Sequence, residues 1–163
     1  MSTPLERVRI LIVDSDQEIR SLTRDMLNSI GILQVYLAND GSRAFGELRE
    51  RPFDIVITER RMEGLDGIEL TRMIRTAADS ANPHIPILMT TAAPSLQDVT
   101  EARDAGVTEF LIKPFSVDSL RKRLIATLEN PREFIEVESY YGPDRRRTVK
   151  DFRGEDMRGR KEE

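Results

Sequence analysis

The stretch FDIVITERRMEGLDG, residues 53–67, joins a run of apolar residues to a charged segment. The apolar part is rich in Ile and Val, which is typical of a strand buried on both faces of a parallel sheet. Such a strand delivers the carboxylate of Glu59 to its exposed end, and Arg60 and Arg61 follow at once. In an open α/β sheet, ligands and chemistry gather at these carboxyl ends.

Four more runs of this kind, and the helical patterns between them, extend the alternation to residue 129. The further strand candidates are residues 8–13, 32–37, 85–90 and 108–112. Helical periodicity is clearest in two segments, 16–29, with its apolar stripe of Ile19, Leu22, Met26 and Leu27, and 117–128, with Val117, Leu120, Leu124 and Leu128. Shorter helical candidates cover 42–49, 67–77 and 96–105. This alternation predicts an α/β fold, a doubly wound five-stranded parallel sheet with helices on both faces.

Composition limits the class of protein. The chain has 163 residues, 39% hydrophobic and 33% charged, with a net charge of −4 and no cysteine. A thiolate nucleophile, a disulfide framework and a Cys-ligated zinc are therefore excluded. No apolar run reaches the roughly 18 residues of a membrane span, and the first residues lack a signal-peptide pattern. We expect a cytoplasmic protein.

The chain divides into a domain, residues 1–130, and an arginine-rich extension, residues 131–163. Pro131 stops the last helix, and the residues beyond it are poor in apolar side chains and show no sustained period. We expect at most a short extended piece at 134–137, in an extension that is otherwise irregular and disordered without a ligand. Residues 145–161 hold eight basic and three acidic side chains.

Polar residues at the strand ends carry a family resemblance. They are Asp14, Glu59, Thr91 and Lys113, and over residues 8–129 the chain resembles the response-regulator receiver (CheY-like, flavodoxin-like) domain. The motifs are ILIVDSD, VITERRMEGLDGIEL, ILMTTAA and FLIKPF. The resemblance implies that Asp14 is the first acidic metal ligand, Thr91 the switch hydroxyl and Lys113 the family's lysine, with a Lys-Pro bond that is commonly cis.

Two departures from the family pattern predict a pseudo-receiver that has lost phosphorylation. Glu59 occupies the place of the phosphoacceptor aspartate, and its extra methylene moves the carboxylate outward by roughly 1.5 Å. Ser15 occupies the place of the second acidic Mg²⁺ ligand, so Mg²⁺ is not expected as a cofactor. Asp16 is one residue later and is expected to point elsewhere. We expect a permanent ion pair between Glu59 and Lys113.

The arginines suggest what replaced phosphorylation. An arginine fork binds phosphate and the guanine O6/N7 edge, and aromatic rings stack on bases. The candidate ligand-binding residues are Arg60, Arg61, Tyr140, Tyr141, Asp144, Arg145, Arg146, Arg147 and Arg153. Through TERRM and YYGPDRRR the chain resembles CheY-like effectors of cyclic di-GMP. That resemblance implies a cyclic di-GMP ligand and a protein partner such as the flagellar motor switch or a histidine kinase.

Three other functions stay open from the sequence. They are a conventional phosphorelay receiver, a ligand-independent scaffold, and a nucleic-acid binder using the basic extension. The last is not favoured, because no helix-turn-helix pattern is present. An enzyme is not expected either, because the chain shows no nucleophile–base pair and no Gly-rich phosphate loop.

Overall fold

The computed structural model describes residues 4–92, 94–129, 134–137 and 140–143, the last two ranges as backbone only. A five-stranded parallel sheet with the order β2-β1-β3-β4-β5 forms the centre of the molecule. Its strands are β1 (Arg9–Val13), β2 (Gln34–Ala38), β3 (Ile55–Glu59), β4 (Ile87–Thr91) and β5 (Glu109–Ile112). The helices are α1 (Gln17–Ser29), α2 (Gly41–Glu50), α3 (Gly67–Thr76), α4 (Leu96–Ala105) and α5 (Val117–Glu129), after a short 3-10 turn at Leu5–Arg7. The predicted fold class is confirmed.

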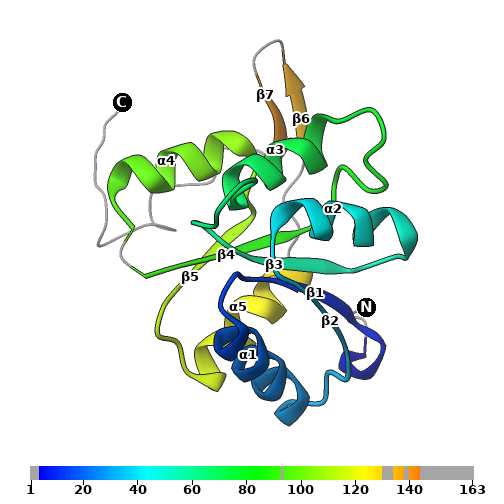
Figure 1. Cartoon of the computed structure of the whole chain (residues 1–163), viewed down its shortest axis with the longest axis vertical. Helices are drawn as coiled ribbons and strands as arrows, with labels where there is room; N and C mark the ends of the chain where they lie inside the picture. Colours follow the sequence, from blue (N-terminus) through cyan, green and yellow to red (C-terminus); the bar gives the residue numbers. More distant parts are fainter. Residues whose placement is uncertain (1–3, 93, 130–133, 138–139, 144–163) are drawn as a thin grey trace.

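Helices cover both faces of the sheet. In Figure 1, α1 and α5 lie on one side, and α2, α3 and α4 lie on the other. Alternate residues of β1 point to the two faces, so Leu11 enters the core under α2, α3 and α4, whereas Ile10 enters the core under α1 and α5. Strands with two buried faces must be apolar at nearly every position, which explains the continuous runs of the sequence.

Short polar side chains start the helices at the carboxyl edge of the sheet. Asp16 caps α1 by accepting from the backbone N–H groups of Glu18 and Ile19. Asp66 caps α3, and Ser95 caps α4, each within a reciprocal capping box. The caps fix where each chain segment turns back from the sheet, and so they position the loops that carry the candidate site.

Two details differ from the sequence prediction. The strands begin one or two residues later than the apolar runs. β2, β3 and β4 also end one residue later, so that Glu59 and Thr91 are the last residues of β3 and β4. Leu22 was predicted to lie on the apolar stripe of α1, and this was wrong: it is half exposed, and Thr23 is buried in its place, one turn before Leu27. Thr23 and Leu27 lie four residues apart, on the same side of the helix. Val117, predicted to lie on the apolar stripe of α5, is also exposed.

The extension contains more regular structure than predicted. The expected extended piece is strand β6 (Phe134–Val137), which pairs with an antiparallel strand, β7 (Tyr140–Pro143). The β7 backbone lies against α3 and α4 (Figure 1). Among the described residues, no helix is both long enough and apolar enough to cross a bilayer.

Candidate functional site

The polar residues at the strand ends meet at one edge of the sheet. Parallel pairing aligns Val13 with Thr58, Glu59 with Thr90, and Thr91 with Ile112. Glu59 and Thr91 end β3 and β4, Asp14 follows β1, and Lys113 follows β5. These four residues, far apart in the sequence, therefore gather at this edge. The Lys113–Pro114 peptide bond is cis, as the resemblance implied.

Lys113 binds two carboxylates at once. Its Nζ lies 3.1 Å from Oδ2 of Asp14 and 3.4 Å from Oε2 of Glu59. Asp14 is buried, and the side chains of Glu59 and Lys113 are mostly buried. Charges in such a position are screened less by water and salt than exposed ones. The structure thus contains the predicted ion pair between Glu59 and Lys113, and Lys113 also pairs with Asp14.

Ser15 holds the other oxygen of Glu59. Its backbone N–H and its hydroxyl both donate to Oε1 of Glu59, each at 3.2 Å. The backbone N–H of Asp16 donates to Oδ1 of Asp14, while the Asp16 carboxylate caps α1. Asp16 thus points away from the site, as predicted. Both oxygens of Glu59 have protein partners.

The environment of Glu59 disfavours its charged form. Burial raises the pKa of the Glu59 carboxyl above its ordinary value of 4.5, and the adjacent Asp14 carboxyl raises it further. Lys113 and the Ser15 backbone N–H lower this pKa, but their effect is the smaller one. Lys113 and Ser15 therefore do not fully offset the burial of Glu59 and its proximity to Asp14.

The donor set at this edge does not fit Mg²⁺. Mg²⁺ demands near-octahedral oxygen ligands. Here Asp14 and Glu59 already share Lys113, and Ser15 faces Glu59 as a hydrogen-bond donor. Within the described ranges, no group of three or more His, Cys, Asp or Glu side chains is placed to hold a metal. The absence of a Mg²⁺ cofactor stays a prediction, argued from this donor set.

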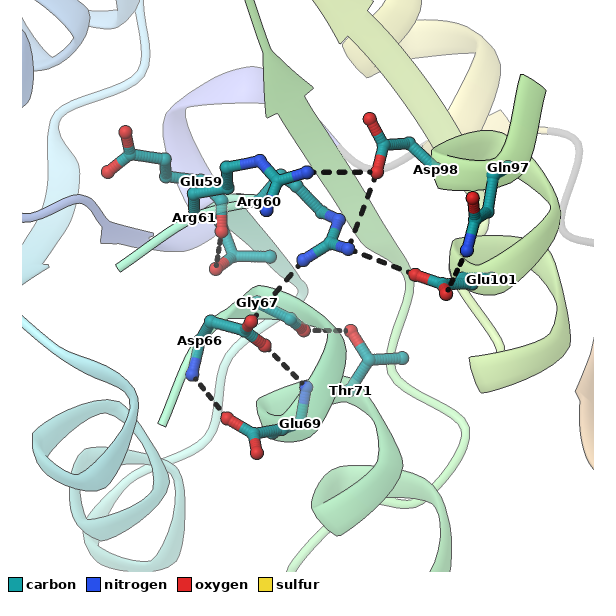
Figure 2. A network of polar contacts seen from close by, with 11 residues as sticks. Glu59, Arg60, Arg61, Asp66, Gly67, Glu69, Thr71, Gln97, Asp98 and Glu101 are labelled. Atoms are coloured by element: carbon teal, nitrogen blue, oxygen red, sulfur yellow. Dashed lines mark hydrogen bonds and ion pairs between the residues drawn. The ribbon is translucent and has the colours of Figure 1, made fainter. Parts of the chain in front are cut away.

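The two arginines after β3 have different surroundings (Figure 2). Arg60 is only 8% exposed, and its guanidinium contacts the carboxylates of Asp66, Asp98 and Glu101. The side chain of Arg61 is 73% exposed, and its guanidinium contacts Asp98 at 3.2 Å. No feature of the sequence separates the two. The ligand role of both arginines stays a prediction, but only Arg61 has a guanidinium that is open to solvent.

The carboxylates around Arg60 were not predicted as part of a site. Asp98 and Glu101 lie three residues apart on α4, a spacing that places them on one side of the helix and could have been noticed. Their pairing with Arg60 joins residues 38 and 41 positions apart, which no local pattern reveals.

The remaining candidate residues belong to the extension. Tyr140 and Tyr141 lie in β7, where only the backbone is described. Asp144, Arg145, Arg146, Arg147 and Arg153 lie outside the described residues. Their predicted contacts with a ligand are untested.

Comparison with known proteins identifies the family. Residues 10–125 match the family model described as the response regulator receiver domain. The chain belongs to the response regulator receiver family. Over 119 residues, this receiver is 35% identical to the chemotaxis protein CheY-3 of Vibrio cholerae, covering 73% of the receiver chain and 90% of CheY-3.

Other relatives agree with this assignment. The receiver is 34% identical over 117 residues to the chemotaxis protein CheY of Pseudomonas aeruginosa, covering 72% of its own chain and 93% of that protein. It superimposes on the CheY4 structure of Vibrio cholerae with a TM-score of 0.69 at 30% identity, over 74% of this chain and 98% of that chain. Receivers of this type are signalling domains, and no catalytic family is indicated.

Proposed function

We propose that this receiver signals without aspartyl phosphorylation. The observation that carries the proposal is the state of Glu59, whose two oxygens are engaged by Ser15 and Lys113. Phosphoryl transfer depends on a nucleophile in the near-attack position. A glutamate that reaches outward and is already paired is poorly placed to attack a phosphodonor. In this proposal the ion pair with Lys113 either imitates the phosphorylated charge state or holds the site shut.

Acetyl phosphate provides the test. Incubation of the full chain with acetyl phosphate and Mg²⁺ is expected to give no acid-labile or hydroxylamine-labile phosphoryl group, as measured by intact mass. A Ser15→Asp, Glu59→Asp variant, in which aspartates occupy the two altered positions, serves as the positive control. A labile acyl phosphate on the wild-type chain would overturn the proposal and favour the phosphorelay receiver.

Cyclic di-GMP is the input we propose in place of phosphorylation. Arg61 offers an exposed guanidinium beside the site, and a guanidinium can bind a phosphate or the guanine O6/N7 edge. The sequence adds the arginines of GPDRRR and the Asp144 carboxylate, which could accept from the guanine N1–H and N2–H₂ groups. The resemblance through TERRM and YYGPDRRR favours this ligand among nucleotides.

Calorimetric titration of cyclic di-GMP into the full chain tests this input, with GTP as the control ligand. We expect micromolar or tighter binding that falls at least tenfold in Arg61→Ala and in a variant with Arg145, Arg146 and Arg147 replaced by Ala. Arg121→Ala removes an exposed arginine of α5, on the opposite side of the sheet, and is expected to bind as the wild type does. An absence of heat with the wild-type chain would leave a ligand-independent scaffold as the better function.

The output we propose is docking on a protein partner, such as the flagellar motor switch or a histidine kinase. Two of the relatives are named chemotaxis proteins. CheY-like domains usually bind their partners through the surface formed by α4, β5 and α5. In this chain that surface exposes Leu96, Ile112 and Val117. A scaffold predicts partner binding that is equal with and without the nucleotide, whereas the proposed effector predicts a difference.

A further inference from the structure

The backbone of Arg60 joins three elements. Arg60 directly follows β3, and its N–H donates to the carbonyl of Thr90 in β4 at 2.9 Å. Its own carbonyl accepts from the N–H of Gly67, the first residue of α3, at 3.1 Å. The start of its side chain is therefore fixed relative to the sheet and to α3.

The side chain of Arg60 extends this connection to a fourth element. Nη1 lies 3.3 Å from Oδ2 of Asp66, the N-cap of α3. Nη2 lies 3.4 Å from Oδ1 of Asp98 and 3.0 Å from Oε1 of Glu101, both on α4 (Figure 2). One guanidinium thus spans the N-cap of α3 and the first two turns of α4.

The carboxylates are themselves held in place. Asp66 and Asp98 accept from backbone N–H groups at the starts of their helices, where negative charge is favourable. The second oxygen of Glu101 accepts from Gln97 at 3.3 Å. The planar fork of an arginine suits several acceptors at fixed positions, whereas a lysine is a point charge. The network is therefore directional, and a different cation cannot fully reproduce it.

We propose that Arg60 is a positioning residue that holds the N-terminal half of α4 against the end of β3. This role does not depend on cyclic di-GMP or on the loss of phosphorylation. It makes the placement of α4 depend on one buried cation at the same sheet edge as Glu59. Arg60 and Arg61, adjacent in the sequence, then have separate tasks: Arg60 holds α4, and Arg61 faces solvent.

Hydrogen exchange of the full chain, followed by mass spectrometry, tests the proposal. Arg60→Met keeps the apolar stem and removes the guanidinium. We expect amides of Leu96–Ala105 to exchange at least tenfold faster than in the wild type, with α1 and α5 changed less than twofold. Arg61→Met removes the adjacent arginine. Its side chain is mostly exposed, so its contact with Asp98 of α4 is expected to contribute little, and α4 exchange should stay within twofold. Arg60→Lys should restore part of the protection that Arg60→Met loses.

Two results would overturn the proposal. One is unchanged exchange of α4 in Arg60→Met; the other is faster exchange of all helices to the same degree, which indicates only a global loss of stability. If Arg60→Met does not fold, Glu101→Gln carries the test, because it removes one charged partner and keeps the buried cation in contact with Asp66 and Asp98. At least threefold faster exchange confined to α4 would support the positioning role, and unchanged exchange would refute it.

Discussion

At the scale of single residues, each oxygen of Glu59 has a polar partner, yet the charged form of this carboxyl is disfavoured. Ser15 and Lys113 contact its two oxygens, yet burial and Asp14 raise its pKa. The meeting of Asp14, Glu59 and Lys113 could be predicted, because the ends of parallel strands share one edge. The burial of Arg60 could not, because it depends on where α4 places Asp98 and Glu101.

The raised pKa of Glu59 gives a pH dependence with a definite sign. The folded state binds the Glu59 proton more readily than the unfolded state, so the contribution of this group to stability falls as pH rises from its ordinary value of 4.5 through the raised value. Urea unfolding of the wild type and Glu59→Gln between pH 4 and pH 7 measures this. The variant should gain stability relative to the wild type as pH rises over this interval.

Asp98 supplies a control of opposite sign. Hydrogen bonding from the Ser95 backbone, together with Arg61, Ser95 and Arg60, lowers the pKa of the Asp98 carboxyl below its ordinary value of 3.8. Its contribution is present above that value and is lost as pH falls through the lowered one. Asp98→Asn should therefore reduce the loss of stability in acid.

A stability gap between Glu59→Gln and the wild type that is constant with pH would contradict the assignment for Glu59.

At the scale of elements, the start of α3 lies unusually close to the end of β3. A Cβ atom on Gly67 would clash with the carbonyl oxygen of Glu59 and would lie 3.1 Å from Cε of Met89. Glycine permits this approach, which brings the capping residue Asp66 within reach of Arg60. The β3–α3 junction therefore tolerates no side chain at Gly67 without a shift of backbone.

Gly67→Ala is expected to lower the free energy of unfolding by about 1–3 kcal/mol, the usual cost of overpacking. Gly46, inside α2, is the matched control, because a Cβ atom added there would have nothing within 4 Å. Gly46→Ala should raise the free energy of unfolding by about 0.5–1 kcal/mol, the helix preference of Ala over Gly. Urea unfolding compares the two variants. Equal stabilities would mean that α3 moves freely away from Glu59.

The elements themselves were predictable to within about two residues, because strands buried on both faces need continuous apolar runs. Strand ends were less predictable, since the last hydrogen-bonded residues, such as Glu59 and Thr91, are polar. The pairing of β6 with β7 was missed because the extension has few apolar residues and no clear period. A backbone ladder can form without such a pattern.

At the scale of the whole molecule, the hydrophobic core that the structure describes lies within the receiver domain. As far as the structure describes the chain, the two core clusters and the side chains packed on them come from residues 5–128. The hydrophobic contribution to folding follows the apolar area that is buried. The boundary near residue 130 should therefore separate a self-sufficient domain from its appendage.

Deletion of residues 131–163 is expected to leave a single cooperative transition, with a melting temperature within about 5 °C of the full chain, equivalent to roughly 1 kcal/mol. Circular dichroism on heating measures it. A loss of cooperativity, or a much lower melting temperature, would mean that the hairpin of β6 and β7 contributes to the stability of α3 and α4, against which β7 lies.

The carboxylate that Lys113 contacts belongs to the chain itself, and this affects how long a signal can last. A phosphoryl group has a lifetime set by hydrolysis, so the signal of a phosphorylated receiver ends when that group is hydrolysed. The Glu59–Lys113 contact is made when the chain folds and has no such decay. Under the proposal that Glu59 is not phosphorylated, the duration of a signal through this domain would follow the arrival and departure of ligand and partner, or the synthesis and degradation of the protein itself.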